Sequence, residues 1–389
     1  MADGGRASAE LTAAPGAWVD GLVTRRRVVV APDSFKGTAT AVEVAESIAA
    51  GWLDVFPEDE VLRVPMADGG EGALDAFELA WPGAERRPVI VTGPDDTVVE
   101  ASWLLLPDGT AVVELANTSG ITLLHPLRPL EAHSLGFGQA VCAALDAGAE
   151  RLVLAIGGSA STDGGAGVLS ELGARFRGAD GATVMPGNGG LGAVVRAEFG
   201  ALRPLPRGGV TILSDVTNPL LGRHGAVAVF GPQKGVGEGL APQAEANLAN
   251  FAGIVGAARA VDPSAEGAGA AGGVGFGLLA WGARMSPGAR AVGEALRLPE
   301  FVAGSDVVLT GEGRYDHQSE SGKVPSYVRG LADAAGARSG LVAGAVQADP
   351  SAFGAAVSLT ELAGSAEPAM ADPRRWLRAA GAALARALP

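Results

Sequence analysis

The feature that most constrains the fold of this chain is a junction that occurs five times. A short apolar run, often rich in β-branched residues, passes directly into a glycine-rich loop that contains an acidic residue. The five junctions are VVVA-PDSFKG, VPMA-DGGEG, VLAI-GGSASTDGGAG, TILS-DVTNPLLG and VVLT-GEGRYD. Apolar runs of this length bounded by turn residues are typical of buried strands, and helical patterns separate several of them. The chain is therefore predicted to be an α/β protein.

The first strand–helix–strand unit shows this pattern in detail. After RVVVA, the segment TAVEVAESIAAGW carries apolar residues at helical spacing, with Val44 and Ile48 on one face. Thr40 and Glu43 stand at the N-cap and N3 positions of a capping box, so a helix is predicted to begin there. VLRVPMA is the next strand and ALDAFELAW the next helix. A unit of this kind implies a parallel sheet covered by helices. Later in the chain, GGAGVLSELGARF is predicted to be another helix.

The length of the chain and the change in its pattern of strands and helices predict two domains. The 389 residues exceed what one hydrophobic core usually supports. Residues 87–116 contain three short strands joined by GPDD and PDG turns, which indicates mixed or antiparallel pairing. Late in the chain, the alternation of strands and helices seen in the first segment returns. We predict a Rossmann-like parallel sheet in a discontinuous first domain, residues 27–90 and 285–389, and a mixed sheet in an inserted α/β domain, residues 91–284. Residues 1–26 show no sustained period and are predicted to be a flexible N-terminal extension.

Composition excludes several classes of partner. The net charge of −14 argues against nucleic acid and anionic membranes, so the expected partners are small molecules. The single cysteine excludes a disulfide framework and a cysteine-ligated metal centre. The sequence contains no apolar run long enough to span a bilayer and no secretory signal, so we expect a cytoplasmic protein. The oligomeric state stays open.

The five loops supply most of the candidate site residues. In open α/β sheets, ligands bind outside the carboxyl ends of the strands, so such loops can converge on one site. Glycine lets backbone N–H groups approach phosphate oxygens, and a following helix adds the positive end of its dipole. Carboxylates among these loops suit a divalent metal ion. The acidic residues of the five loops are Asp33, Asp68, Glu71, Asp163, Asp215, Glu312 and Asp316.

Lysine gives an independent indication of a phosphate site. Of the 29 basic residues only three are lysine, and each is adjacent to a glycine in the sequence: Lys36, Lys234 and Lys323. A compact ammonium at a crowded phosphate differs from a planar guanidinium, which gives a reason for lysine in an arginine-rich chain. We expect at least two of the three to contact phosphate.

Several well-known motifs are not matched. The pattern G-x-x-x-x-G-K-[ST] fails, because His317 stands at its first glycine and Val324 follows Lys323. GGVGFG lacks the spacing of a dinucleotide fingerprint, which disfavours the alternative of a dehydrogenase on a doubly wound sheet. GGSAS departs from a nucleophile elbow at its last position.

The ordered set of loops resembles one protein family. APDSFKG, PMADGGEG, IGGSASTDGGAG, SDVTNPLLGRHGA, FGPQKG, GAAGGVGFG and TGEGRYDHQSESGKVP are together similar to the bacterial glycerate kinase family, type 1, related to glyoxylate- and glucarate-pathway kinases. The resemblance runs from about residue 27 to the C-terminus. It implies two α/β domains with a cleft between them, and transfer of the γ-phosphoryl group of ATP to D-glycerate with Mg²⁺. The family contains producers of 2-phosphoglycerate, so this product is favoured over 3-phosphoglycerate.

Phosphoryl transfer requires positioning, charge neutralisation and an in-line nucleophile, and roles are assigned accordingly. The expected catalytic residues are Lys36, Asp68, Asp215 and Asp316, with either of the last two as the base that accepts the proton of the substrate hydroxyl. The expected metal ligands are Asp68, Glu71 and Glu312. The residues expected to bind substrate or phosphate are Ser34, Gly69, Gly70, Gly157, Gly158, Ser159, Asp163, Asn218, Lys234, Arg314 and Lys323.

Departures from the family pattern leave alternatives open. AHSLGFGQ, with His133, Phe137 and Gln139, stands where a threonine- and serine-rich segment followed by GTGE is expected. If that segment faces the acceptor, another small hydroxy or sugar acid is the substrate. A non-catalytic ligand-binding homologue is a further alternative, which the acids retained in all five loops disfavour. Tyr315 and His317 also replace the commoner leucine and small residue.

Overall fold

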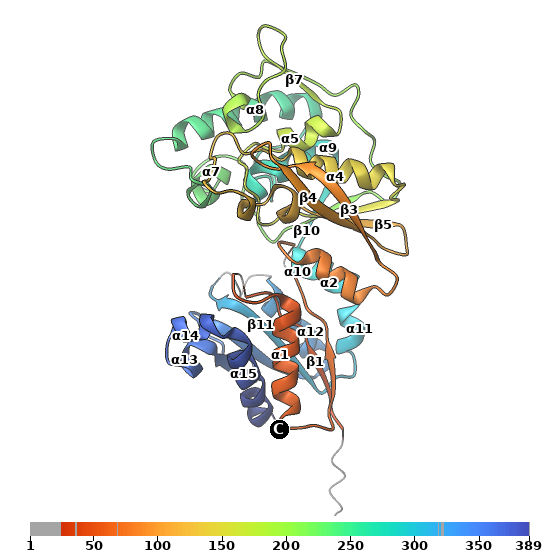
Figure 1. Ribbon diagram of the computed structural model, residues 1–389, viewed down its shortest axis with the longest axis vertical. Helices are drawn as coiled ribbons and strands as arrows, with labels where there is room; N and C mark the ends of the chain where they lie inside the picture. Colours follow the sequence, from red (N-terminus) through yellow and green to blue (C-terminus); the bar gives the residue numbers. More distant parts are fainter. Residues whose placement is uncertain (1–24, 36, 68, 318, 320–322, 389) are drawn as a thin grey trace, which may run out of the picture.

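The computed structural model describes residues 25–35, 37–67, 69–317, 319 and 323–388, and two sheets organise them (Figure 1). The expected N-terminal extension lies almost wholly outside this range, as do Lys36 and Asp68. Residues 25 and 26 are the part of the extension that the structure describes. Arg26 is ion-paired with Asp59, with 2.8 Å between Nη2 and Oδ2.

The first sheet is parallel throughout. Its strand order is β13-β12-β11-β1-β2, and every pair is parallel. Its strands are β1 (Arg27–Val30), β2 (Glu60–Arg63), β11 (Val307–Tyr315), β12 (Arg338–Val346) and β13 (Ala355–Ser358). Helices α1 (Ala41–Leu53) and α15 (Pro373–Ala387) pack on one face and α12 (Val324–Ala335) on the other. Two short helices, α13 (Leu359–Ala363) and α14 (Ala366–Ala371), follow β13.

The second sheet is mixed. Its order is β10-β9-β6-β5-β4-β3, antiparallel among the last three strands and parallel among the others. Its strands are β3 (Glu85–Thr92), β4 (Val98–Leu105), β5 (Thr110–Glu114), β6 (Arg151–Ala155), β9 (Val210–Leu213) and β10 (Arg284–Ser286). β7 (Arg175–Arg177) and β8 (Arg196–Glu198) form a separate two-stranded sheet.

The helices of the second half gather around this mixed sheet. The helices of six or more residues that share its main hydrophobic core are α4 (Leu135–Asp146), α5 (Ala166–Glu171), α8 (Ala241–Arg259) and α9 (Val274–Trp281). The short helices are α3 (Ala116–Ser119), α6 (Asn188–Leu191) and α7 (Ala226–Phe230), with 3₁₀ turns at Ile121–Leu123, Pro232–Lys234 and Ala270–Gly273.

An apolar cluster of described residues joins the two sheets. Helices α2 (Ala73–Ala80), α10 (Gly288–Ala295) and α11 (Leu298–Val302) lie between them (Figure 1). The cluster takes Val29 and Val308 from the first sheet, Leu104 and Val112 from the second, and Phe77 from α2. Buried hydrophobic side chains therefore keep the two halves of the chain in contact.

The predicted α/β fold with one parallel and one mixed sheet is confirmed, and the capping box of Thr40 and Glu43 is formed at α1. Strand β3 begins at Glu85 and pairs with β4. Its first residues therefore lie in residues 27–90, which the sequence assigned to the first domain, although the strand belongs to the second sheet. The domain division itself stays a prediction. Among the described residues, no helix has both the length and the apolar character needed to cross a membrane.

Two local expectations were wrong. The helix expected over GGAGVLSELGARF stops at Glu171, because Gly173 adopts a φ of +111° and the chain turns into β7. The GEGRY segment was expected to be a loop, yet it continues β11 to Tyr315. Glycine makes this extension possible, since a Cβ on Gly311 would lie 2.6 Å from Val342 O and one on Gly344 would lie 2.3 Å from Gly313 O.

The crossing of α1 and α15 gives a test of the packing. A Cβ on Gly51 would lie 1.9 Å from the carbonyl oxygen of Arg378. Gly51→Ala should therefore lower the free energy of unfolding by about 1–3 kcal/mol, measured by chemical denaturation. Gly253→Ala in α8 is the matched control, because its new methyl group meets nothing within 4 Å. It should be neutral or stabilise by about 0.5–1 kcal/mol. Equal stability of the two variants would contradict this packing.

Candidate active site

The charged residues after the last junction lie on one face of a strand. Successive side chains of a strand point to opposite faces, so Glu312 and Arg314 on β11 share a face and Asp316, just beyond it, continues the alternation. Tyr315 points the other way and packs its ring on Phe353, with ring centroids 5.9 Å apart. Regular backbone, not a free loop, therefore sets the spacing of these ionisable groups.

β1 and β11 meet at the topological switch point of the first sheet. From β1 the chain crosses to β2 on one side, and from β11 it crosses to β12 on the other. Asp33 N–H donates to Gly311 O over 2.8 Å, and Thr310 Oγ1 donates to Ala31 O over 2.9 Å. Ligands of open α/β sheets bind at such a position, where adjacent connections diverge.

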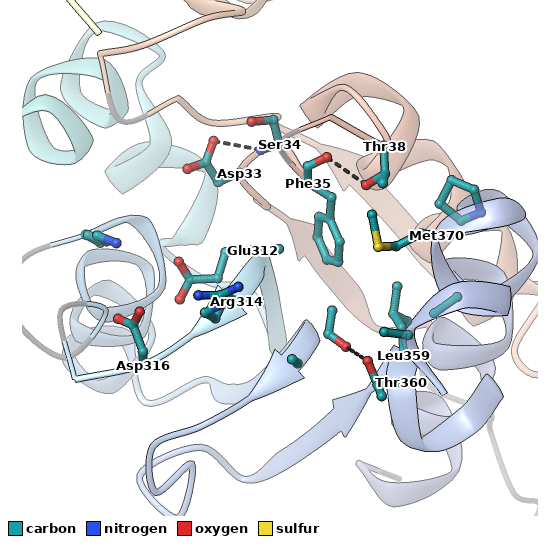
Figure 2. A pocket seen from close by; sticks show the side chains of 17 residues that line it. Asp33, Ser34, Phe35, Thr38, Glu312, Arg314, Asp316, Leu359, Thr360 and Met370 are labelled. Carbon is teal, nitrogen blue, oxygen red and sulfur yellow. Dashed lines mark hydrogen bonds between the residues drawn. The ribbon is translucent and has the colours of Figure 1, made fainter. Parts of the chain in front are cut away.

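A cavity of about 460 Å³ occupies this position, and we call it the switch-point pocket. Figure 2 shows the acidic and basic side chains Asp33, Glu312, Arg314 and Asp316 together on one side of it. Its lining residues are Asp33, Ser34, Phe35, Thr38, Glu312, Gly313, Arg314, Asp316, Lys323, Gly344, Ala345, Leu359, Thr360, Ala366, Ala369, Met370 and Pro373. Lys323 is also the N-cap residue of α12, so the positive end of that helix lies at the same site.

A second cavity of about 460 Å³ lies between the two halves, and we call it the interdomain pocket. Ser34 and Thr38 line both pockets, so the loop after β1 forms a boundary common to them. The lining of the interdomain pocket is Ser34, Gly37, Thr38, Ala39, Thr40, Ala41, Glu43, Glu71, Gly72, Leu74, Asp75, Arg86, Glu114 and Asn117.

Glu114 is an interdomain-pocket residue that the sequence did not single out. Its carboxylate is buried and accepts a hydrogen bond from Leu74 N over 3.2 Å at the start of α2. Burial raises the pKa of Glu114 to about 7, opposed by backbone hydrogen bonds from Leu74 and Gly72. The run TAVV followed by Glu114 repeats the strand–acid junction, but the loop after it lacks the glycines of the other five.

Glycines bring three of the other loops into contact. Gly157 N–H donates to Gly69 O over 3.0 Å, and a Cβ on Gly157 would lie 2.5 Å from the Cα of Gly70. A Cβ on Gly69 would lie 2.6 Å from Leu213 O, directly before the loop that carries Asp215. The loops after β2, β6 and β9 thus converge, as their shared strand-end position predicts.

Two residues of the β9 loop are placed by local hydrogen bonds. Asp215 Oδ1 accepts from Gly288 N over 2.7 Å at the start of α10, and Asn218 Nδ2 donates to His224 O over 2.8 Å. Neither residue lines the two pockets described above.

Asp163 and Lys234 lie in the interior of the second half rather than on a pocket wall. Lys234 Nζ donates to Ser159 Oγ over 2.7 Å and to Ser161 O over 2.6 Å. Burial lowers the pKa of Lys234 to about 7, and the charge of Asp163 opposes this. Asp163 accepts five hydrogen bonds, two of them from Ser134. Neither residue lines either of the two pockets, and their contact with phosphate stays a prediction.

The AHSLGFGQ segment also points away from both pockets. His133 is buried and lies 3.2 Å from Asp96 Oδ1 through Nε2. Phe137 is fully buried in the core, and Gln139 Oε1 accepts a hydrogen bond from Thr92 N. None of these three residues lines either pocket, and the identity of the acceptor stays a prediction.

The residues of the switch-point pocket fit a metal ion shared with phosphate. Within the described part of the chain, no group of three or more histidine, cysteine, aspartate or glutamate side chains is arranged to hold a metal ion. Mg²⁺ needs only one or two carboxylates when phosphate and water complete its shell. Glu312 and Asp316 offer such oxygens beside Arg314 and Lys323. Of the other expected ligands, Glu71 lines the interdomain pocket and Asp68 lies outside the described residues.

Comparison with known proteins identifies the family. A model of the glycerate kinase family matches residues 28–389, and the chain belongs to that family. It is 42% identical to the glycerate 2-kinase of Escherichia coli (strain K12) over 312 residues, covering 79% of this chain and 82% of the relative. It is 41% identical to the glycerate kinase of Bacillus subtilis (strain 168), covering 77% and 80%.

A solved structure supports the fold assignment. The crystal structure assigned as a glycerate kinase 2 from Salmonella typhimurium LT2 superposes with a TM-score of 0.78 at 36% identity. The match covers 92% of this chain and 98% of that one. The similarity therefore extends over both sheets and the residues between them.

The buried lysine predicts a specific pH dependence of stability. Because the folded pKa of Lys234, about 7, is below its ordinary value of 10.5, the unfolded state binds more protons between these values. The folded protein should gain stability as pH rises through this window. Lys234→Met should remove that gain, so that wild type improves relative to the variant by roughly 2 kcal/mol between pH 7 and pH 9 in urea denaturation.

Ser159→Ala is the control for this measurement. It removes one hydrogen-bond partner of Lys234 and keeps the amine, so the pH dependence should remain. Parallel stability curves for wild type and Lys234→Met would show that the amine does not titrate in this window.

Proposed function

We propose that this chain is a glycerate kinase that transfers the γ-phosphoryl group of ATP to D-glycerate and forms 2-phosphoglycerate. The observation that carries the proposal is the switch-point pocket, where carboxylates and cations from the β1 and β11 segments and the N-terminus of α12 face one cavity. Family membership supports the reaction class, and the printed name of the Escherichia coli relative supports the 2-position. The single cysteine is in keeping with a cytoplasmic enzyme.

The pocket residues divide into cationic and acidic groups. Arg314 and Lys323 neutralise the phosphate tail, and the N-terminus of α12 adds its dipole. Glu312 is the proposed metal ligand on this wall. Mg²⁺, when bound, spreads the charge that develops on the transferred phosphoryl group. Lys36, from the loop of Ser34, remains a proposed phosphate ligand on its sequence position alone.

The acceptor side is proposed to be the interdomain pocket. Ser34 lies on the boundary of both pockets, so a phosphoryl group near it would face both cavities. Glu71, and Asp68 by its sequence position, would complete the metal site from this side. Asp316 and Asp215 both remain candidates for the base: Asp316 faces the switch-point pocket beside the phosphate tail, and the carboxylate of Asp215 accepts a hydrogen bond from Gly288 N. The glycines at positions 69, 70, 157 and 158 would bring backbone N–H groups to substrate oxygens.

One experiment tests activity, acceptor and position together. Incubation with MgATP and D-glycerate, followed by phosphorus NMR, should yield 2-phosphoglycerate. A panel of longer hydroxy and sugar acids measured by ATP consumption should give lower kcat/KM values. A signal from 3-phosphoglycerate would correct the position, and turnover confined to another acid would correct the acceptor. No turnover with any acid would favour the non-catalytic alternative.

The proposed roles of β11 residues give a mutational prediction. Arg314→Ala and Asp316→Asn should each lower kcat/KM at least 100-fold, because each removes a charge or proton acceptor used in the transition state. Arg290→Ala is the control, since Arg290 is exposed and pairs with Glu294 on α10 away from both pockets. Near-normal activity of either β11 variant would remove that residue from the mechanism.

Nucleotide and metal should stabilise the fold together. A ligand present at a hundred times its Kd adds about 2.7 kcal/mol to the free energy of unfolding. MgATP should therefore raise the melting temperature, and ATP with a chelator should raise it less. Glu312→Gln should reduce the difference between the two conditions. Equal shifts with and without Mg²⁺ in the wild-type protein would argue against a metal-linked site.

A further inference from the structure

The switch-point pocket has two chemically distinct halves. Figure 2 shows Phe35 between the charged side chains of β1 and β11 and a second wall that carries Leu359 and Met370. Apart from Ala345 on β12, the apolar residues of the pocket are Phe35, Leu359, Ala366, Ala369, Met370 and Pro373. They come from the β1 loop, from the short helices α13 and α14, and from the first residue of α15.

The apolar half has no use in the chemistry described so far. Phosphates and a metal ion need charge, and a short hydroxy acid offers almost no apolar surface. Within this apolar half, Phe35 and Leu359 are almost completely buried, whereas 62% of the surface of Met370 is exposed. A flexible thioether beside an aromatic ring is well suited to close over a flat ring, because sulfur–aromatic contacts are favourable and methionine adapts its shape.

We propose that this apolar half binds the adenine base of the phosphate donor, an inference that rests on the proposed kinase function. The base lies against Phe35, Leu359 and Met370, and the triphosphate tail passes Arg314 and Lys323. The γ-phosphoryl group then reaches Ser34, the residue that lines both pockets. A cavity of about 460 Å³, partly apolar and partly charged, suits a ligand of this mixed character.

Two hydroxyl groups give the apolar half of the pocket, which we call the slot, a preference among nucleotide bases. Thr38 Oγ1 donates to Phe35 O over 2.7 Å, and Thr360 Oγ1 donates to Gly344 O over 2.8 Å. Because each hydroxyl hydrogen is already used, the oxygen offers lone pairs to a ligand. An acceptor suits the exocyclic amino group of adenine, whereas guanine presents a carbonyl oxygen at the corresponding position. ATP is therefore expected to be a better donor than GTP.

The test separates the base from the phosphate tail by measuring each alone. Calorimetry would use two probes, adenosine without phosphates and Mg²⁺–tripolyphosphate without a base. Met370→Ser should weaken adenosine binding at least fivefold and leave tripolyphosphate binding within twofold. Arg314→Ala should show the opposite pattern. Met185→Ser, at a methionine that is 75% exposed in the other half of the molecule, is the matched control and should change neither.

A second variant keeps the test decisive if Met370→Ser changes adenosine binding only slightly. Ala366 is exposed and lines the slot, so Ala366→Trp should fold and should block adenosine while tripolyphosphate still binds. The wild-type kcat/KM for ATP should exceed that for GTP at least tenfold. Equal values would overturn the role given to the two threonine hydroxyls.

The outcomes distinguish the slot from the kinase activity. Adenosine that fails to bind wild type at millimolar concentration, or binds Met370→Ser and Ala366→Trp unchanged, would overturn the slot even if the enzyme phosphorylates glycerate. If these variants instead weaken the binding of D-glycerate and leave adenosine binding unchanged, the apolar half would be assigned to the acceptor acid. Adenosine binding that responds as expected, without turnover of any acid, would support the slot and count against the proposed kinase function.

Discussion

The parallel pairing of β1 with β11 is the interaction on which the site depends. The two strands join residues that are 279 positions apart in the sequence, with the whole second sheet in between. This pairing places Asp33 and Ser34 beside Glu312 and Arg314 at the carboxyl ends of their strands. The long connection makes the contact costly in chain entropy, and the buried valines of both strands offset that cost. Without it, the charged residues of each segment would have no common pocket.

The apolar cluster between the two sheets has a second consequence. Relative motion of domains is the ordinary expectation unless their interface is large and hydrophobic. Here α2 and α10 bury side chains against both sheets, with Phe77 and Val292 in the same cluster as strand residues from each half. In the proposed mechanism, a donor in one pocket and an acceptor in the other would meet at the loop of Ser34, which lines both pockets.

Two of the three lysines show how one residue type takes different environments within one chain. Lys323 caps α12 and lines the switch-point pocket, whereas Lys234 is buried beneath the GGSAS loop and bonded to Ser159 and Ser161. Both follow or precede a glycine in the sequence, so local spacing could not separate them. Glu114 illustrates the reverse case, because an acid at a strand end that lacks a glycine-rich loop still lines a pocket. Long-range packing, which no local pattern records, decides both outcomes.

By itself, the sequence determined the order of the elements and the class of the fold. Alternating apolar runs, the capping box at Thr40 and Glu43, and turn residues act over a few positions, so local patterns are enough to predict them. The same patterns predicted that acidic, glycine-rich loops meet at strand ends. Only the tertiary structure decided which of these loops share a pocket, that GEGRY is strand, and that an apolar wall from α13 and α14 faces Arg314. Those features depend on which strands become neighbours, and strand order is set by the burial of the whole chain.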